Sequence, residues 1–232
     1  MTIRGILFDK DGTLLDFNAT WVPVNRHAAL AIAAGDEALA ARLLDAGGQD
    51  EKTGTVRAGS LLAAGNSDEI GALWAGISGD GNLPGLVARL DEIFQSQGHE
   101  YAAPVPGLAA ILTRLHQRGL ALGIATSDSH EGAIQTLSPF GVLDLFDFIT
   151  GYDSGHGHKP EPGMVHAFCR EAGLQPNEVC MVGDNTHDLE MGRNAGVGMV
   201  VGVLTGTSGA ADLTPAADHV LASIGDLEAL LD

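Results

Sequence analysis

Short apolar runs that each stop at polar residues recur along the chain, and they predict buried parallel strands. The first run covers residues 3–8 and ends abruptly in Asp9-Lys10-Asp11-Gly12, a sequence typical of a turn after a strand. Later runs of this form cover residues 120–126, 146–150, 179–182, 197–203 and 219–221. Between them, apolar residues recur at helical spacing, for example over residues 107–118 and 161–172, and a closing helix is expected over 224–231. Strands that alternate with helices predict an α/β fold with a doubly wound parallel sheet.

One long segment breaks this alternation, because from about residue 17 to residue 100 the pattern predicts helices only. The expected helices cover residues 23–34, 37–45, 68–77 and 83–97, and a glycine-rich irregular loop at 46–59 divides them. We therefore expect two domains that share a cleft. Residues 1–16 and 101–232 would form the α/β core domain, and residues 17–100 an inserted α-helical domain.

Charge and composition exclude several classes of partner. The chain has 232 residues, of which 30 are acidic and 12 are basic, so its formal net charge is −18. A surface this acidic is repelled by nucleic acid and by anionic membranes, so neither is expected as a partner. The longest apolar stretch is far shorter than the ~20 residues of a membrane-spanning helix. Both cysteines lie in apolar segments and no secretory signal pattern is present, which favours a cytoplasmic location.

Polar side chains gather where the predicted strands end. In open parallel sheets, ligands bind beyond the carboxyl ends of the strands. The polar residues that fall at these ends are Asp9, Asp11, Thr126, Ser127, Asp184 and Asp188. Several carboxylates in one crevice repel one another unless a cation lies between them, and oxygen ligands suit Mg²⁺. The sequence therefore predicts a Mg²⁺ site at this edge of the sheet.

Four short motifs in this region resemble those of a known family. They are Asp9-x-Asp11-Gly12-Thr13-Leu14, Thr126-Ser127, Lys159-Pro160 and Gly183-Asp184-x-x-x-Asp188. In order and in placement they resemble the four motifs of the haloacid dehalogenase superfamily hydrolases. The resemblance covers the whole core domain, and the helical insertion resembles the cap of that superfamily. The particular likeness is to the phosphoglycolate phosphatase group, which pairs such a cap with Asp-x-Asp-Gly-Thr-Leu.

The resemblance implies a Mg²⁺-dependent phosphatase that acts on a small phosphorylated metabolite through an aspartyl-phosphate intermediate. It makes Asp9 the nucleophile that takes the phosphoryl group. It makes Asp11 the acid that protonates the leaving group and then the base that deprotonates the attacking water. Lys10, between the two acids, is expected to point away, while the turn amides of residues 10–12 face phosphate oxygens.

The second and third motifs are expected to hold the phosphoryl group itself. The resemblance assigns two phosphoryl oxygens to the Thr126 hydroxyl and the Ser127 backbone N–H. Lys159 would neutralise both Asp9 and the phosphoryl group. These three residues would therefore stabilise the charge that spreads over the phosphoryl oxygens during transfer.

The first and fourth motifs are expected to bind the metal. The resemblance implies that Asp9, Asp184 and the backbone carbonyl of Asp11 coordinate Mg²⁺, which leaves positions for water and phosphate. Asp188 lies one helical turn after Asp184 and faces the same way. It would either hold a Mg²⁺-bound water or orient Lys159.

Two other readings share part of this pattern. A phosphosugar mutase of the same superfamily has all four motifs and differs in keeping water from the intermediate, although Thr13 resembles the phosphatases more. A receiver-type phospho-switch also uses an aspartate, Mg²⁺ and a Lys-Pro pair. Receivers lack an inserted domain, and their acceptor aspartate ends the third strand, where this chain has Thr150-Gly151.

The expected cap contains one loop with two cations in an otherwise acidic chain. Residues 47–60 include Lys52 and Arg57, and this loop is expected to close over the substrate. Arg57 would then pair with a carboxylate of the leaving group, which would fit phosphoglycolate. The alternative is that Arg57 is an exposed arginine on a flexible loop.

Overall fold

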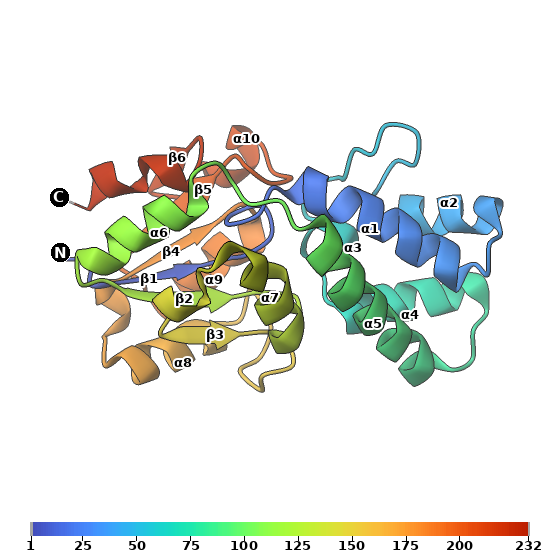
Figure 1. Cartoon of the computed structure of the whole chain (residues 1–232), viewed down its shortest axis with the longest axis horizontal. Helices are drawn as coiled ribbons and strands as arrows, with labels where there is room; N and C mark the ends of the chain where they lie inside the picture. The colour runs from blue at the N-terminus through green and yellow to red at the C-terminus, as the bar shows by residue number, and fades with distance from the viewer. Residues whose placement is uncertain (1, 232) are drawn as a thin grey trace.

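The sheet expected from the strand pattern is present in the computed structural model, which describes residues 2–231 (Figure 1). The strands lie in the order β3-β2-β1-β4-β5-β6, and each neighbouring pair is parallel. They are β1 Gly5–Phe8, β2 Ala121–Ala125, β3 Phe148–Thr150, β4 Val179–Gly183, β5 Met199–Val203 and β6 His219–Leu221. The predicted α/β fold with a parallel sheet is therefore confirmed.

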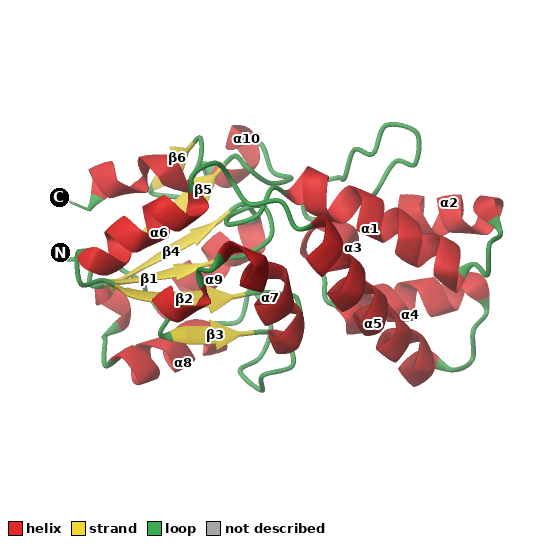
Figure 2. Ribbon diagram, in the orientation of Figure 1, coloured by secondary structure: helices red, strands yellow, loops and turns green. Residues whose placement is uncertain are grey.

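Helices cover both faces of the sheet (Figure 2). They are α6 Leu108–Gln117, α7 His130–Leu137, α8 Gly163–Ala172, α9 Thr186–Ala195 and α10 Ala210–Leu213, with short 3-10 helices at Ser138–Phe140, Leu143–Leu145, Pro176–Glu178 and Ile224–Leu230. Successive side chains of a strand point to opposite faces. Ile6 and Phe8 accordingly pack in one apolar cluster with α6, whereas Leu7 packs in another with Phe168 of α8. The all-apolar pattern of β1 thus reflects burial on both faces.

The last element differs in type from the sequence expectation. A helix was expected over residues 224–231, and the structure has a 3-10 helix over Ile224–Leu230. Its two buried side chains, Ile224 and Leu227, are three residues apart, which is the period of a 3-10 helix. A short apolar pattern of this kind does not distinguish the two helix types.

Five helices form a separate unit, which we call the cap. They are α1 Phe17–Ile32, α2 Glu37–Gly47, α3 Leu61–Ala64, α4 Ser67–Ser78 and α5 Leu83–Tyr101. The cap has its own apolar cluster around the fully buried Trp74, whose indole N–H donates to the Leu43 carbonyl at 3.0 Å. Helix α1 starts earlier than expected, since Asp16 caps it by accepting from the Ala19 N–H. None of the helices within residues 2–231 is long and apolar enough to cross a membrane.

The cap lies at the carboxyl ends of the strands, toward which the strand arrows point in Figure 1. Two connecting segments run side by side between the domains, since the Asp16 N–H donates to the Ala103 carbonyl and the Val105 N–H to the Leu14 carbonyl. Further contacts tie helix α5 to the core, among them a hydrogen bond from the Tyr152 hydroxyl to Asp91. This placement closes the cap over the strand ends.

Candidate active site

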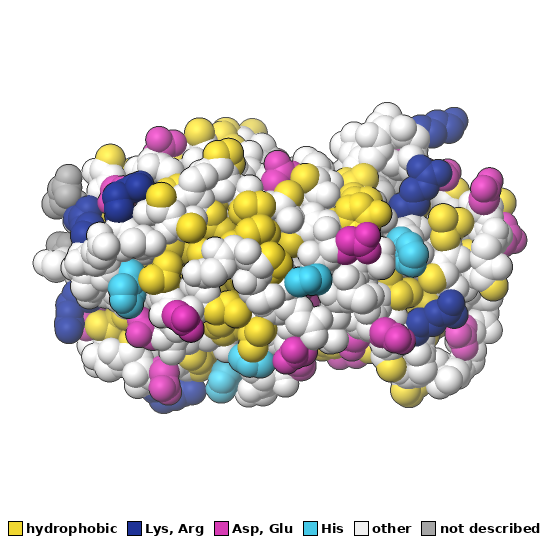
Figure 3. Space-filling view, viewed as in Figure 1, with side chains coloured by type: hydrophobic (Ala, Val, Ile, Leu, Met, Phe, Trp, Pro, Cys, Tyr) yellow, Lys and Arg dark blue, Asp and Glu magenta, His cyan; other side chains and the backbone are white. Residues whose placement is uncertain are grey.

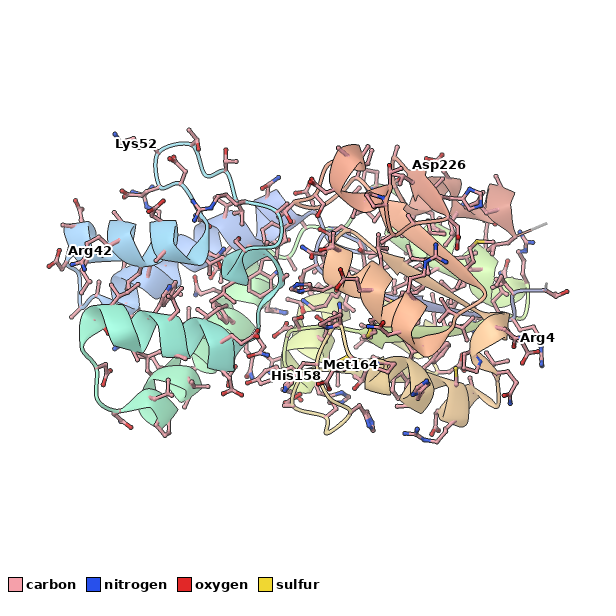
Figure 4. All side chains as sticks on the ribbon, turned by 180° about the vertical axis from the view of Figure 1, so that it is seen from behind. Arg4, Arg42, Lys52, His158, Met164 and Asp226 are labelled. Carbon is pink, nitrogen blue, oxygen red and sulfur yellow. The ribbon has the colours of Figure 1, made fainter. Side chains whose placement is uncertain are left out.

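The strand ends and the cap together enclose one cavity of about 70 Å³. Its core wall contains Asp9, Asp11, Thr126, Ser127, Lys159, Asp184 and Asp188. In Figure 4 the site lies between the cap and the core, near the labelled His158 and Met164, which line an adjoining cavity together with Lys159. The structure therefore brings the residues of all four motifs into one place.

Lys159 joins two of these acids in a buried charge network. Its Nζ atom lies 2.5 Å from Asp9 Oδ1 and 2.7 Å from Asp188 Oδ1, and the lysine side chain is only 4% exposed. Burial alone would lower the pKa of Lys159, but the Asp188 and Asp9 carboxylates outweigh it and raise the pKa above its usual value. Lys159 is therefore charged and fixes one oxygen of Asp9.

Asp9, Asp184 and Asp188 form a carboxylate cluster whose charge one lysine cannot balance. Each offers an oxygen, and these oxygens lie within 4.8 Å of one another. Burial raises the pKa of Asp9 to about 7 despite Lys159, and it raises the pKa of Asp184 well above the usual value. Asp9 Oδ2 is buried without a hydrogen-bond partner among the described residues. These residues fit a further cation, and an all-oxygen donor set suits Mg²⁺.

Two glycines make room for the Asp184 carboxylate. A Cβ atom on Gly12 would lie 2.6 Å from Asp184 Cγ, and the φ of Gly12, +91°, also disfavours other residues. A Cβ atom on Gly206 would overlap Asp184 Oδ2, which accepts a hydrogen bond of 3.0 Å from the Thr207 N–H. The Asp184 carboxylate is thus held against the turn that carries Asp9.

Asp188 already has a donor on each of its carboxylate oxygens. Oδ1 is bound by Lys159, and Oδ2 accepts from the Asn185 N–H at 3.0 Å, in a capping box at the start of α9. Asp184, by contrast, has a donor on Oδ2 alone within residues 2–231, so Asp9 and Asp184 are the members of the cluster better suited to ligate a metal. Of the two roles expected for Asp188, this geometry favours that of orienting Lys159.

The residues expected to bind phosphate lie at the tip of β2. The Thr126 N–H continues the sheet by donating to the Thr150 carbonyl at 3.0 Å, and this fixes the side chain at the cavity wall. Thr126 Oγ1 accepts from the Asp128 N–H at 3.1 Å, so the proton of the hydroxyl remains free to donate. Ser127, the next residue, also lines the cavity.

Lys10 does not point away from the site, so this expectation is wrong. Its side chain is fully buried, and its Nζ lies 2.7 Å from Asp11 Oδ1 and 3.1 Å from Asp128 Oδ2. The Trp21 indole N–H, from the cap, also donates to Asp11 Oδ1, at 2.5 Å. Lys10 follows the end of β1 at Phe8, so the alternation of side chains along a strand does not set its direction. Asp11 is therefore held through one oxygen by both domains.

Replacing Lys10 with methionine should lower the free energy of unfolding by about 3–5 kcal/mol, because Asp11 and Asp128 would lose their buried partner. Urea unfolding measures this change. Lys52→Met is the matched control, since Lys52 is exposed and its loss should change stability by less than about 0.5 kcal/mol. Equal stability of the two variants would contradict a structural role for the buried lysine.

Neither cation of the cap loop is at the cavity. The Arg57 guanidinium donates to the Asp45 backbone carbonyl at 2.6 Å, and its side chain is 59% exposed. Lys52 lies at the outer end of the loop in Figure 4. The Arg57 side chain therefore lies against α2 and not at the cavity where the resemblance expects the substrate, although Gly59 and Ser60 at the end of the same loop line the adjoining cavity with Lys159.

The cap supplies other residues that the sequence analysis did not single out. Phe17, Trp21 and Asn25 line the cavity from α1, and Phe94 of α5 packs edge-on against Trp21 with ring centroids 5.7 Å apart. The spacing of four residues between the three positions on α1 places them on one helix face, a signal that was available in the sequence. From the core domain, His187 at the start of α9 also lines the cavity.

Comparisons with known proteins match the chain to one family model, to curated relatives and to solved structures. Residues 3–196 match the family model of haloacid dehalogenase-like hydrolases. A phosphoglycolate phosphatase of Yersinia pseudotuberculosis is 30% identical over 235 residues, covering 97% of this chain and 91% of the relative. Pyrophosphatase PpaX of Halalkalibacterium halodurans is 32% identical over 150 residues, covering 62% of this chain and 69% of the relative. A solved hydrolase from Pseudomonas syringae shares the fold with a TM-score of 0.73 at 22% identity, covering 99% of this chain and 98% of that one.

The fold, the acids at the strand ends and the matched family model define one class of protein. The chain belongs to the haloacid dehalogenase-like hydrolases. Within this family it falls in the phosphoglycolate phosphatase-like group, and it is a phosphatase. The name of the group describes its relatives.

Proposed function

We propose that this protein is a Mg²⁺-dependent phosphatase that hydrolyses a small phosphomonoester through a phosphorylated Asp9. The observation that carries the proposal is the Asp9 side chain, with one oxygen fixed by Lys159 at 2.5 Å and the other buried without a partner in the described part of the chain. A carboxylate that is fixed but not fully hydrogen-bonded is suited to nucleophilic attack. Phosphoglycolate belongs in the first set of esters to test, because relatives carry its name.

In the first step, an oxygen of Asp9 attacks phosphorus, and the bond between phosphorus and the leaving oxygen breaks. Asp11 donates a proton to that oxygen. Lys159, the Thr126 hydroxyl and the Ser127 backbone N–H stabilise the negative charge on the phosphoryl oxygens. In the second step, Asp11 takes a proton from water, which attacks phosphorus and releases phosphate from Asp9.

The residues suited to hold Mg²⁺ are Asp9 and Asp184, with the backbone carbonyl of Asp11. When bound there, the metal offsets the charge of the carboxylates and polarises a phosphoryl oxygen. Asp188 keeps Lys159 in place and Trp21 keeps Asp11 in place, so this lysine and this acid are both oriented before substrate enters. The closed cap shields the site from bulk solvent while the first step takes place.

Excess chelator should stop phosphate release from p-nitrophenyl phosphate, and added Mg²⁺ should restore it. Mg²⁺ should also raise the melting temperature, since it binds the folded chain only. This rise should be larger at about pH 8 than at about pH 5.5, because the raised pKa values of Asp9 and Asp184 let protons compete with metal at the lower pH. Full activity in chelator without added metal would contradict the metal assignment.

A further inference from the structure

The cap's share of the cavity wall is apolar and carries no charge within the described part of the chain. Phe17, Trp21 and Phe94 supply aromatic rings, and Leu62 and Ile70 supply aliphatic side chains. The other cap residues of this wall are small or, in the case of Asn25, neutral and polar. Since the core wall takes the phosphoryl group, this apolar wall faces the leaving group of the ester.

The cations of the described cap lie elsewhere. They are Arg26, Arg42, Lys52, Arg57 and Arg89, all of them exposed and none of them lining the cavity. On the face seen in Figure 3, Lys and Arg side chains lie toward the two ends of the molecule, away from the junction of cap and core. The two buried lysines, Lys10 and Lys159, are each already paired with two carboxylates.

A carboxylate on the leaving group would therefore find no free lysine or arginine in this cavity among residues 2–231. The cavity wall already contains five carboxylates and a single lysine. A metal held by Asp9 and Asp184 would offset the charge of the phosphoryl group and of those acids, at the opposite end of the substrate. An unpaired carboxylate enclosed by apolar side chains loses hydration without gaining a partner, which disfavours its binding.

The cap wall contains the starts of helices α1 and α4; Asp16 caps α1, and polar and acidic side chains offset the partial positive charge at the start of α4. Helix N-termini carry a partial positive charge. Here Asn66 Oδ1 accepts from the Glu69 N–H, and Glu69 Oε2 accepts from the Asn66 N–H. Asp68 and Glu69 also place two acids in the first turn. This helix end therefore has little attraction left for a further anion.

Asn25 gives the apolar wall one fixed hydrogen-bond acceptor. The Gln49 amide nitrogen donates to the Val22 carbonyl at 3.1 Å, so Gln49 Oε1 accepts from Asn25 Nδ2, at 3.0 Å. Asn25 Oδ1 then has no hydrogen-bond partner among residues 2–231, and it belongs to a side chain that is 2% exposed and lines the cavity. An amide oxygen accepts from a hydroxyl or N–H group and repels a carboxylate.

We propose that the substrate's leaving group is an uncharged alcohol with a short apolar body and a second hydroxyl, which donates to Asn25 Oδ1. The inference rests on the proposed function. It separates this chain from a phosphatase selective for phosphoglycolate, whose leaving group carries a carboxylate. The apolar body packs between Trp21, Phe94 and Ile70, while the phosphoryl group lies on the core wall.

Three alkyl esters of similar size test the proposal: ethylene glycol monophosphate, propyl phosphate and phosphoglycolate, with p-nitrophenyl phosphate as a general reference. With Mg²⁺, the wild-type kcat/KM for ethylene glycol monophosphate should exceed that for phosphoglycolate at least about tenfold. The hydroxyl of the first ester pairs with Asn25, whereas the carboxylate of the second finds no partner in the cavity wall. The kcat/KM for propyl phosphate should lie between these two values. In Asn25→Leu, the preference for the hydroxyl over the propyl ester should disappear, with the melting temperature recorded to verify folding.

A cation placed in the cavity should change this preference. Ala64 lines the cavity and is partly exposed, so it accepts a longer side chain. The quantity to compare is the kcat/KM for phosphoglycolate divided by that for ethylene glycol monophosphate. This ratio should be about tenfold higher in Ala64→Arg than in the matched Ala64→Gln, because the arginine adds one charged hydrogen bond to the carboxylate.

A wild-type enzyme that prefers phosphoglycolate would overturn the inference. If His187→Gln then removed that preference, the imidazole would be the partner of the carboxylate. Phosphate release from none of the esters, p-nitrophenyl phosphate included, would overturn the proposed function itself. The two failures are therefore distinguishable.

Discussion

Asp9→Asn should reduce phosphate release on the order of 10⁴-fold or more, since an amide cannot attack phosphorus and the first step of the reaction is lost. The fold should survive the change. Burial raises the pKa of Asp9, so the ionised carboxylate is disfavoured in the metal-free folded chain at neutral pH. A neutral amide of the same shape removes that penalty, so the melting temperature without metal should stay the same or rise.

Two measurements distinguish loss of the nucleophile from a general defect. Acid quenching of wild-type enzyme during turnover, followed by peptide mapping, should locate a phosphoryl group on Asp9 and no adduct in the variant. Asp11→Asn is the matched control, because it should keep the phosphorylated Asp9 detectable while losing about 10²–10⁴-fold in turnover. A phosphoryl group mapped to another residue would refute the assignment of Asp9.

Lys159→Met should lower kcat/KM about 10²–10³-fold, because it removes the charge that faces both Asp9 and the transferred phosphoryl group. It should also reduce the free energy of unfolding of the metal-free chain by about 3–5 kcal/mol, since Asp9 and Asp188 would face each other unpaired. Steady-state kinetics and urea unfolding measure the two effects separately.

The double variant Lys159→Met/Asp188→Asn separates stability from catalysis. Removing the second carboxylate should restore part of the lost stability, because less buried charge is left unpaired. Activity should not recover, because the phosphoryl group still lacks its countercharge. Near-wild-type kinetics for Lys159→Met would show that the lysine serves the fold alone.

Much of the core domain and its site could be predicted from local sequence patterns. Apolar runs that stop at polar turns placed the strands within a few residues, since a buried strand of a parallel sheet must be apolar on both faces. The same rule placed Asp9, Thr126 and Asp184 at strand ends, and parallel strands bring those ends to one edge. The start of α1 and the short helix α3 were missed, because capping by Asp16 and packing against the cap outweigh local propensity there.

The sequence by itself therefore determined the parallel sheet, the inserted helices and the acids that meet at the strand ends. Only the tertiary structure decided that Lys10 is paired with Asp128, that Arg57 lies outside the cavity, and that Asn25 is fixed by Gln49. The physical reason is the range of the interactions. Strand and turn patterns reflect neighbouring residues, whereas the direction of a cap side chain depends on how separate helices pack against one another and against the core.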